Sequence, residues 1–89
     1  MDRIFSNRMA LVIGGSGGIG KAVAKALANE GAQIYIHGGH SKDRLERTLR
    51  EVQQIQTAQG LPLEQQHHQT LLLPITGVDS VKVVLETVP

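Results

Sequence analysis

The chain has 89 residues, a net charge of +1 and no cysteine. A chain of this length forms one small domain at most and buries only roughly 60 to 65% of the surface that its unfolded form exposes. The charge excludes a strong electrostatic attraction to nucleic acid or an acidic membrane surface. The lack of cysteine excludes a disulfide framework and a thiolate metal site. The N-terminal residues are charged and carry no long apolar core, so we expect no secretory signal, no membrane span and a cytoplasmic protein.

The first expected elements are a strand, a helix and a second strand. Residues 9–13 form an apolar run that is typical of a buried strand. Residues 18–30 have helical periodicity, and Gly31 supplies the left-handed residue that ends the helix. The helix pattern consists of Ile19, Val23, Ala26 and Leu27. Residues 32–37, AQIYIH, have the composition of a second strand. A right-handed crossover makes the two strands parallel, with the turn at their carboxyl ends.

A second helix and a third strand are expected in the remaining sequence. Residues 42–59 carry an apolar stripe, with mixed charges on the solvated side that include Arg44 and Arg47. The stripe consists of Leu45, Leu49, Val52 and Ile55. Residues 61–69 form a polar connection, in which the adjacent His67 and His68 have no further ligand at metal spacing, so we predict no metal site. Residues 70–73, TLLL, form a buried strand, and a last short helix begins at Asp79 or Ser80.

The turn after the first strand is the most informative segment. Five of its seven residues are glycines, which permit backbone angles and close approaches that a Cβ would block. They are Gly14, Gly15, Gly17, Gly18 and Gly20. A helix that begins there directs its unpaired N–H groups and its positive dipole end outward. The segment from Gly18 to Gly20 therefore predicts a binding site for a phosphate group.

Three motif patterns overlap on these glycines. Gly15, Gly17 and Gly20 satisfy GxGxxG, which is a weak signal in a glycine-rich run. Gly15, Gly20 and Lys21 satisfy GxxxxGK, but Ala22 follows where an NTPase loop needs a Ser or Thr hydroxyl for magnesium. The third pattern is GxxxGxG, directly after the strand.

The third pattern, at Gly14, Gly18 and Gly20, lies in ALVIGGSGGIGKAVAKALANEGAQIYIHGG. This segment closely resembles the N-terminal part of the short-chain dehydrogenase/reductase family. The resemblance implies that these glycines bind a nicotinamide dinucleotide and that Ser16 and Ile19 line its pyrophosphate and nicotinamide side. Two positions depart from the family pattern. Ile13 replaces a threonine whose hydroxyl braces the turn, and Gly17 stands where NADP-dependent members often have an arginine.

The end of the second strand bears on the choice of cofactor. NAD-selective dinucleotide folds usually have Asp or Glu there, whereas this chain reads HGGHSK over residues 37–42 and has no carboxylate before Asp43. His40, Ser41, Lys42 and Arg44 could donate to a 2′-phosphate. We therefore favour NADP(H) over NAD(H), although Gly39 replaces a basic residue that many NADP-dependent relatives carry. In the alternative interpretation these are solvated residues at a helix start, with Ser41 as the N-cap.

The predicted cofactor-binding residues come from the turn and from the end of the second strand. They are Gly14, Ser16, Gly17, Gly18, Ile19, Gly20, His37, Gly39, His40, Ser41 and Lys42. Pro74 stands where the family resemblance implies an aspartate that binds adenine. Adenine recognition would then depend on backbone groups.

The fold class implied by the resemblance is α/β, a Rossmann-type doubly wound parallel sheet. Residues 1–89 would form the N-terminal part of a single NAD(P)-binding domain, with three parallel strands in the order 3-2-1. The expected activity is hydride transfer between NADP(H) and a carbonyl or alcohol substrate. The family's catalytic Ser and Tyr-x-x-x-Lys have no counterpart here, because the sole tyrosine is Tyr35 and Gly39 follows four residues later. We therefore expect a fragment of a longer enzyme, or alternatively a non-catalytic dinucleotide-binding module or truncated remnant, with substrate, direction and oligomeric state left open.

Overall fold

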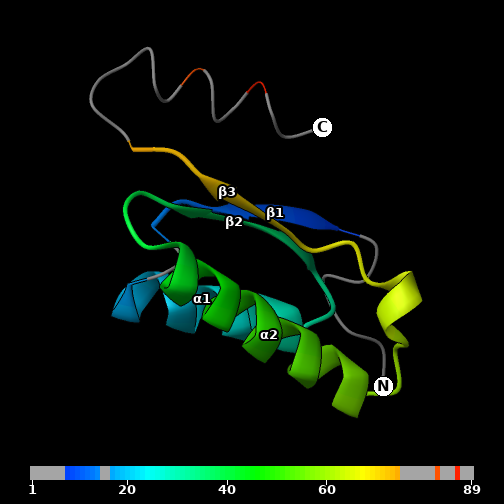
Figure 1. The fold of residues 1–89 in the computed structure, drawn as a ribbon. Helices are drawn as coiled ribbons and strands as arrows, with labels where there is room; N and C mark the ends of the chain where they lie inside the picture. The colour runs from blue at the N-terminus through cyan, green and yellow to red at the C-terminus, as the bar shows by residue number, and fades with distance from the viewer. Residues whose placement is uncertain (1–7, 15–16, 75–81, 83–85, 87–89) are drawn as a thin grey trace.

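The computed structural model describes residues 8–14, 17–74, 82 and 86. Its elements follow the predicted order of alternating strands and helices (Figure 1). They are β1 (Met9–Val12), α1 (Gly18–Asn29), β2 (Gln33–Gly38), α2 (Lys42–Ala58), the 3₁₀ helix η1 (Leu63–Gln65) and β3 (Gln69–Leu72). The helix expected after Asp79 lies largely outside the described residues. In the part of the chain that is described, no helix is long and apolar enough to cross a membrane.

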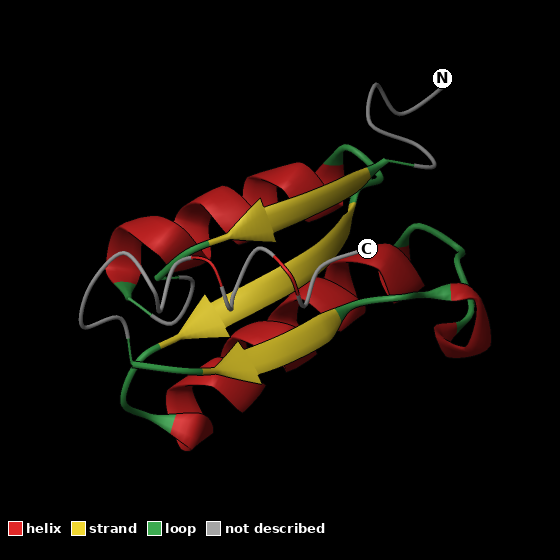
Figure 2. Cartoon of the chain, turned by 90° about the horizontal axis from the view of Figure 1, so that it is seen from above, coloured by secondary structure: helices red, strands yellow, loops and turns green. Residues whose placement is uncertain are grey.

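The three strands form one parallel sheet in the order β1-β2-β3, which confirms the predicted Rossmann-type arrangement. Met9 lies opposite Gln33 in the first pair, and Tyr35 lies opposite Gln69 in the second. Figure 2 shows the three arrows pointing the same way, with both helices on one face of the sheet. The glycine turn and the loop between β2 and α2 therefore lie at the same, carboxyl edge of the sheet.

The hydrophobic core lies between the sheet and the two helices. Ile34 and Ile36 at the centre of β2 are fully buried, and they pack with Val12 of β1. The helices contribute Ala24, Ala28, Leu45 and Val52, and Ala32 just before β2 completes the cluster. Leu49 and Ile55 pack at the edge of this cluster, so the predicted apolar stripe of α2 is confirmed.

The buried face of α1 is formed mainly by small residues. Ile19 is 86% exposed and Val23 is 45% exposed, whereas Ala24 and Ala28 are fully buried. Because α1 packs against β1, β2 and α2, small side chains occupy the positions where these elements approach most closely. Ile19 and Val23 lie on the outer side of the helix, whereas Leu27 is partly buried and packs against the core.

The third strand is less buried than predicted. Leu72 is 45% exposed, and Gln69 and Thr70 are also exposed. Within the described sheet β3 pairs with β2 alone. It is the edge strand of the described sheet, as the predicted order implies, but its side chains are more exposed than expected.

A buried glutamine joins four parts of the fold. The Gln56 amide nitrogen donates to the carbonyl oxygens of Ala28, at 3.0 Å, and Ala32, at 2.8 Å. The Gln56 amide oxygen accepts from Gln33 Nε2 at 3.1 Å and from His68 Nε2 at 3.0 Å. These four contacts use the full hydrogen-bonding capacity of the amide. Gln56 therefore ties α2 to the end of α1, the start of β2 and the segment before β3.

His68 completes this network as a neutral ring. Its Nδ1 accepts from the backbone N–H of Ile34 at 3.0 Å, so its Nε2 carries the proton that is donated to Gln56. Burial lowers the pKa of His68 to about 4, and the charge of His67 adds to the effect. His68 is thus a structural residue, and no group of three or more potential metal ligands gathers among the described residues.

Candidate cofactor site

The glycine turn connects β1 to α1 within a few residues. Gly14 has a φ of +74°, a left-handed conformation that side-chain-bearing residues rarely adopt. The Gly17 N–H donates to the Gly14 carbonyl oxygen at 3.2 Å and closes the turn. Ser16, which was predicted to contact the cofactor, lies outside the described residues together with Gly15.

The N-terminus of α1 carries no side-chain cap. Gly17 is the N-cap residue, it makes no side-chain capping hydrogen bond, and the first turn contains no acidic residue. By contrast, Ser41 caps α2 by accepting from the Arg44 N–H at 3.2 Å, and Asp43 lies in the first turn of that helix. The first N–H groups of α1 and its positive dipole end are therefore suited to an external anion.

Gly17 and Gly18 leave space that the described protein does not fill. A Cβ built on Gly18 would meet nothing within 4 Å, and one on Gly17 would meet only the Gly14 carbonyl oxygen at 3.7 Å. Neither residue has a positive φ. Neither backbone strain nor packing in the described protein thus requires glycine at these positions. Their lack of side chains suits the close approach of a phosphate group, so the turn fits a dinucleotide.

His37 is buried at the end of β2 and contacts the glycine turn. The residue is 3% exposed, its Nδ1 accepts from the Gly14 N–H at 3.2 Å, and its Nε2 contacts the Leu73 carbonyl oxygen at 2.6 Å. Because Nδ1 accepts a hydrogen bond, the hydrogen on Nε2 is donated to the carbonyl oxygen of Leu73. Both ring nitrogens are therefore used within the protein. The imidazole holds the glycine turn at the point where Ile13 offers no bracing hydroxyl.

The loop between β2 and α2 has the geometry of a capped helix start. Ser41 caps α2, as the alternative interpretation of this segment expected. Lys42 is largely exposed and pairs weakly with Glu46, with Nζ and Oε1 3.9 Å apart. His40 is exposed, and a Cβ on Gly39 would lie 4.0 Å from the Cα of Pro74. Pro74 therefore lies beside the carboxyl end of β2.

A cavity of about 280 Å³ lies between the start of α1 and the first turns of α2. Its lining comprises Gly17, Gly18, Lys21, Arg44, Arg47 and Thr48. Sequence reasoning placed Arg47 on a solvated helix face and did not assign Lys21 to the cofactor. The three-residue spacing of Arg44 and Arg47, which puts both on one helix face, is the signal that could have indicated the cluster.

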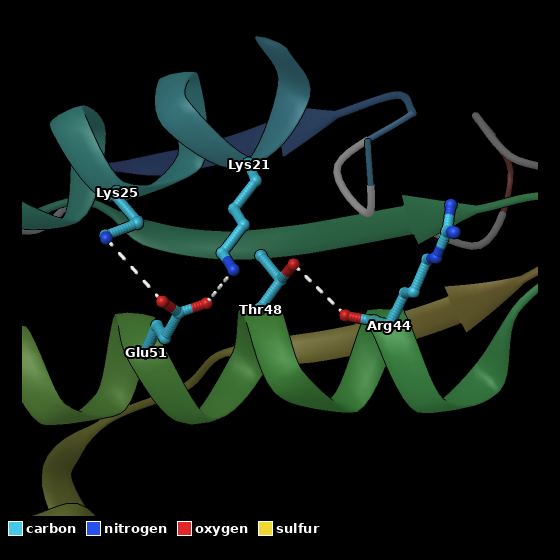
Figure 3. A network of polar contacts seen from close by, with 5 residues as sticks. All are labelled: Lys21, Lys25, Arg44, Thr48 and Glu51. Atoms are coloured by element: carbon cyan, nitrogen blue, oxygen red, sulfur yellow. Dashed lines mark hydrogen bonds and ion pairs between the residues drawn. The ribbon is translucent and has the colours of Figure 1, made fainter. Parts of the chain in front are cut away.

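An ion-pair group lies next to this cavity and joins the two helices. Figure 3 shows Lys21 and Lys25 of α1 directed at Glu51 of α2, while the Arg44 side chain extends away from that carboxylate. The Lys25 Nζ lies 3.6 Å from the carboxylate. The hydrogen bond from Lys21 holds the pKa of Glu51 below its ordinary value. One carboxylate is thus shared by two ammonium groups.

Comparison with known proteins places this geometry in a family. The short chain dehydrogenase profile matches residues 8–72. An uncharacterized oxidoreductase, YvrD of Bacillus subtilis, is 33% identical over 60 residues, which cover 67% of this chain and 22% of that protein. A 3-oxoacyl-[acyl-carrier-protein] reductase, FabG of Staphylococcus epidermidis, is 41% identical over 46 residues, covering 52% of this chain and 19% of the reductase.

Solved structures show the same likeness. The apo-form of glucose dehydrogenase from Caenorhabditis elegans has a TM-score of 0.71 and 28% identity, covering 94% of this chain and 32% of that one. A short-chain dehydrogenase/reductase of unknown function from the same organism, with cofactor, has a TM-score of 0.70 and 29% identity, covering 93% and 28%. The chain thus spans 22% or less of these curated relatives and about a third of these solved chains. With a family profile that matches most of its length and a bare helix N-terminus behind a glycine turn, the chain belongs to the short-chain dehydrogenase/reductase family of oxidoreductases, whose cofactor is a nicotinamide dinucleotide.

Proposed function

We propose that this chain is the NAD(P)(H)-binding portion of an oxidoreductase that transfers hydride between NADP(H) and a carbonyl or alcohol substrate. Residues 1–89 would form the N-terminal part of a single dinucleotide-binding domain. The observation that carries the proposal is the uncapped start of α1. Gly17 and Gly18 lie there although the described protein has room for a side chain at both positions. Glycine at these positions is explained by a ligand whose phosphate group must approach the backbone N–H groups closely.

The residues of this chain would bind and orient the cofactor. The N–H groups at Gly18, Ile19 and Gly20 would donate to the pyrophosphate, and the dipole of α1 would favour its negative charge. His37 would keep the turn in place through its hydrogen bond to Gly14. The bound dinucleotide supplies the hydride donor or acceptor. The acid–base residues that act on the substrate are expected in sequence outside these 89 residues.

The preference for NADP(H) rests on charge at the carboxyl end of β2. No carboxylate lies between Gly31 and Lys42 to accept from ribose hydroxyls or to repel a 2′-phosphate. Two unit charges about 4 Å apart at a surface-like dielectric interact by about 4 kcal/mol. The lack of such a carboxylate removes the main repulsion against NADP(H), and the nearby cations of α2 favour it.

The proposal is tested by titrating the full-length protein with NADPH and NADH and by replacing Gly18. A Gly18→Val substitution is expected to abolish binding of both cofactors, because the side chain occupies the space of the pyrophosphate. The same variant should unfold at nearly the wild-type denaturant concentration, since its Cβ meets nothing within 4 Å. Ala22→Val, on the exposed side of α1 one turn further on, is the matched control and should bind normally. Unchanged affinity in Gly18→Val would contradict the proposal.

A non-catalytic dinucleotide-binding module or truncated remnant is the alternative function. It is favoured by the position of the sole tyrosine, since Tyr35 is inside β2 and paired with both Leu11 and Gln69 in the sheet. The mass of the native protein separates the two functions. A longer protein that contains Tyr-x-x-x-Lys and oxidises NADPH with a carbonyl substrate supports the enzyme, whereas a native chain of 89 residues that binds cofactor without turnover supports the module.

A further inference from the structure

His37 connects two segments at the carboxyl edge of the sheet that are far apart in the sequence. Its Nδ1 accepts from the backbone N–H of Gly14, in the turn after β1, at 3.2 Å, and its Nε2 lies 2.6 Å from the carbonyl oxygen of Leu73, directly after β3. Figure 2 shows the three strands ending at this edge. The buried imidazole therefore bridges the proposed cofactor turn and the chain that follows β3.

The two hydrogen bonds of the ring depend on one proton. A neutral imidazole carries a single N–H, so Nδ1 can accept from Gly14 only while the hydrogen is on Nε2. That hydrogen is the one donated to Leu73. In the other neutral tautomer, Nδ1–H would face the Gly14 N–H and Nε2 would face a carbonyl oxygen, so both bonds would be lost together. Because hydrogen bonds in a chain also polarise one another, the two contacts act as one unit.

The Leu73 backbone is held by two consecutive residues at the end of β2. Its N–H donates to the carbonyl oxygen of Gly38 at 3.0 Å, and its carbonyl oxygen accepts from His37. A Cβ built on Gly39 would lie 4.0 Å from the Cα of Pro74, so the two segments also approach each other there. Pro74 has no backbone N–H of its own to donate. The bond from His37 is therefore the contact that fixes the peptide between Leu73 and Pro74.

We infer that His37 is a positioning residue that couples the glycine turn to the peptide between Leu73 and Pro74, so that occupation of the turn by a dinucleotide also orders the backbone after β3. The inference rests on the proposed dinucleotide-binding function and adds to it a route from the occupied turn to the chain beyond. Occupation of the turn fixes the Gly14 N–H, and the fixed N–H favours the ring with its hydrogen on Nε2. That hydrogen then holds the Leu73 carbonyl. By linkage, order at Leu73 favours the turn conformation that binds the cofactor.

The test compares the free and NADPH-saturated states of the full-length protein by hydrogen exchange. In the wild type, NADPH should slow exchange of the Leu73 N–H about tenfold beyond any slowing at a control amide, a factor within the usual range of coupling between sites. The control is the Gln66 N–H, which donates to Leu63 before the amino end of β3 and reports general stabilisation by the ligand. Nitrogen NMR of the imidazole should show the hydrogen on Nε2 in the bound state.

His37→Asn separates coupling from support of the turn, because its amide oxygen can accept from Gly14 but the side chain is too short to donate to Leu73. At saturating NADPH the extra slowing at Leu73 should be lost in this variant. His67→Asn, which changes an exposed histidine before the amino end of β3, is the matched control and should keep it.

Three results would overturn the inference while leaving the proposed function in place. They are a wild type with no extra slowing at Leu73, equal slowing in the wild type and in His37→Asn, and a bound-state ring with its hydrogen on Nδ1. The first and the third need no substitution, so the inference stays testable even if His37→Asn does not fold. If the wild type binds neither NADPH nor NADH, the inference and the proposed function both fail.

Discussion

The His37 clamp yields a quantitative prediction about the glycine turn. The ring joins three segments, since it accepts from Gly14 after β1, belongs to β2, and donates to Leu73 after β3. His37→Leu removes both hydrogen bonds at similar volume. Each bond contributes about 1 kcal/mol net, and a carbonyl left without its donor adds a penalty of about 1 kcal/mol. We therefore expect His37→Leu to lower the free energy of unfolding by about 2 to 3 kcal/mol.

Two partial replacements separate the turn from the third strand. In His37→Asn the amide oxygen occupies roughly the place of Nδ1 and can still accept from Gly14. In His37→Gln the amide nitrogen reaches roughly the place of Nε2 and can still donate to Leu73. Ordering one released turn residue costs about 1 to 2 kcal/mol. Loss of the Gly14 bond should therefore weaken NADPH binding about five- to thirtyfold, in His37→Gln and His37→Leu but much less in His37→Asn.

The measurements are urea unfolding and NADPH titration of the full-length protein. His40→Asn is the control, because His40 is an exposed histidine three residues away and surface changes usually alter stability by less than about 0.5 kcal/mol. The reasoning is refuted if His37→Leu unfolds at the wild-type urea concentration. It is equally refuted if His37→Asn and His37→Gln lose the same cofactor affinity, since the Gly14 bond would then have no separate effect.

Three further predictions concern the helix contacts. Gln56→Leu should lower the free energy of unfolding by about 3 kcal/mol, because it leaves the carbonyls of Ala28 and Ala32 without donors; wild-type stability by urea unfolding would contradict this. The pKa of His68 is about 6.5 in the unfolded chain and about 4 in the folded protein. The unfolded chain therefore binds a proton at a higher pH than the folded protein, so the free energy of unfolding should fall as the pH decreases from about 6.5 to about 4. The full shift corresponds to about 3 kcal/mol, which solvent screening at a half-buried ring reduces to about 1 to 2 kcal/mol, and a His68→Gln variant should lose this part of the pH dependence. Glu51→Gln should cost at most about 1 kcal/mol of stability, since the pair is partly exposed, and a larger loss on urea unfolding would contradict this.

Local patterns in the sequence were sufficient for most of the framework. Alternation of apolar runs with helical periodicity predicted the order of β1, α1, β2, α2 and β3, with ends within one or two residues of those observed. Glycine at 31 and serine at 41 indicated the helix boundaries, and both have the expected geometry. These features depend on backbone conformation and on neighbours a few residues away, which the sequence states directly.

The buried face of α1 could not be assigned in the same way. The helix has large apolar residues on one side and alanines on another, and both sets have helical spacing. Which side is buried depends on how closely α2 and the sheet approach, and that distance suits Ala24 and Ala28 rather than Ile19 and Val23. Likewise, β3 has the composition of a buried strand, but Leu72 is 45% exposed in the described structure.

The sequence alone determined the class of fold, the family and the place of the glycine turn, because each is carried by contiguous residues. Only the tertiary structure decided what the polar side chains do. His37 meets Gly14 and Leu73, and Gln56 meets Ala28 and His68, across separations of 12 to 36 residues along the chain. The convergence of Arg44 and Arg47 with Lys21 likewise requires two helices to be packed side by side. The physical reason is that a polar group's role depends on its partner, and no local pattern specifies a partner from a distant segment.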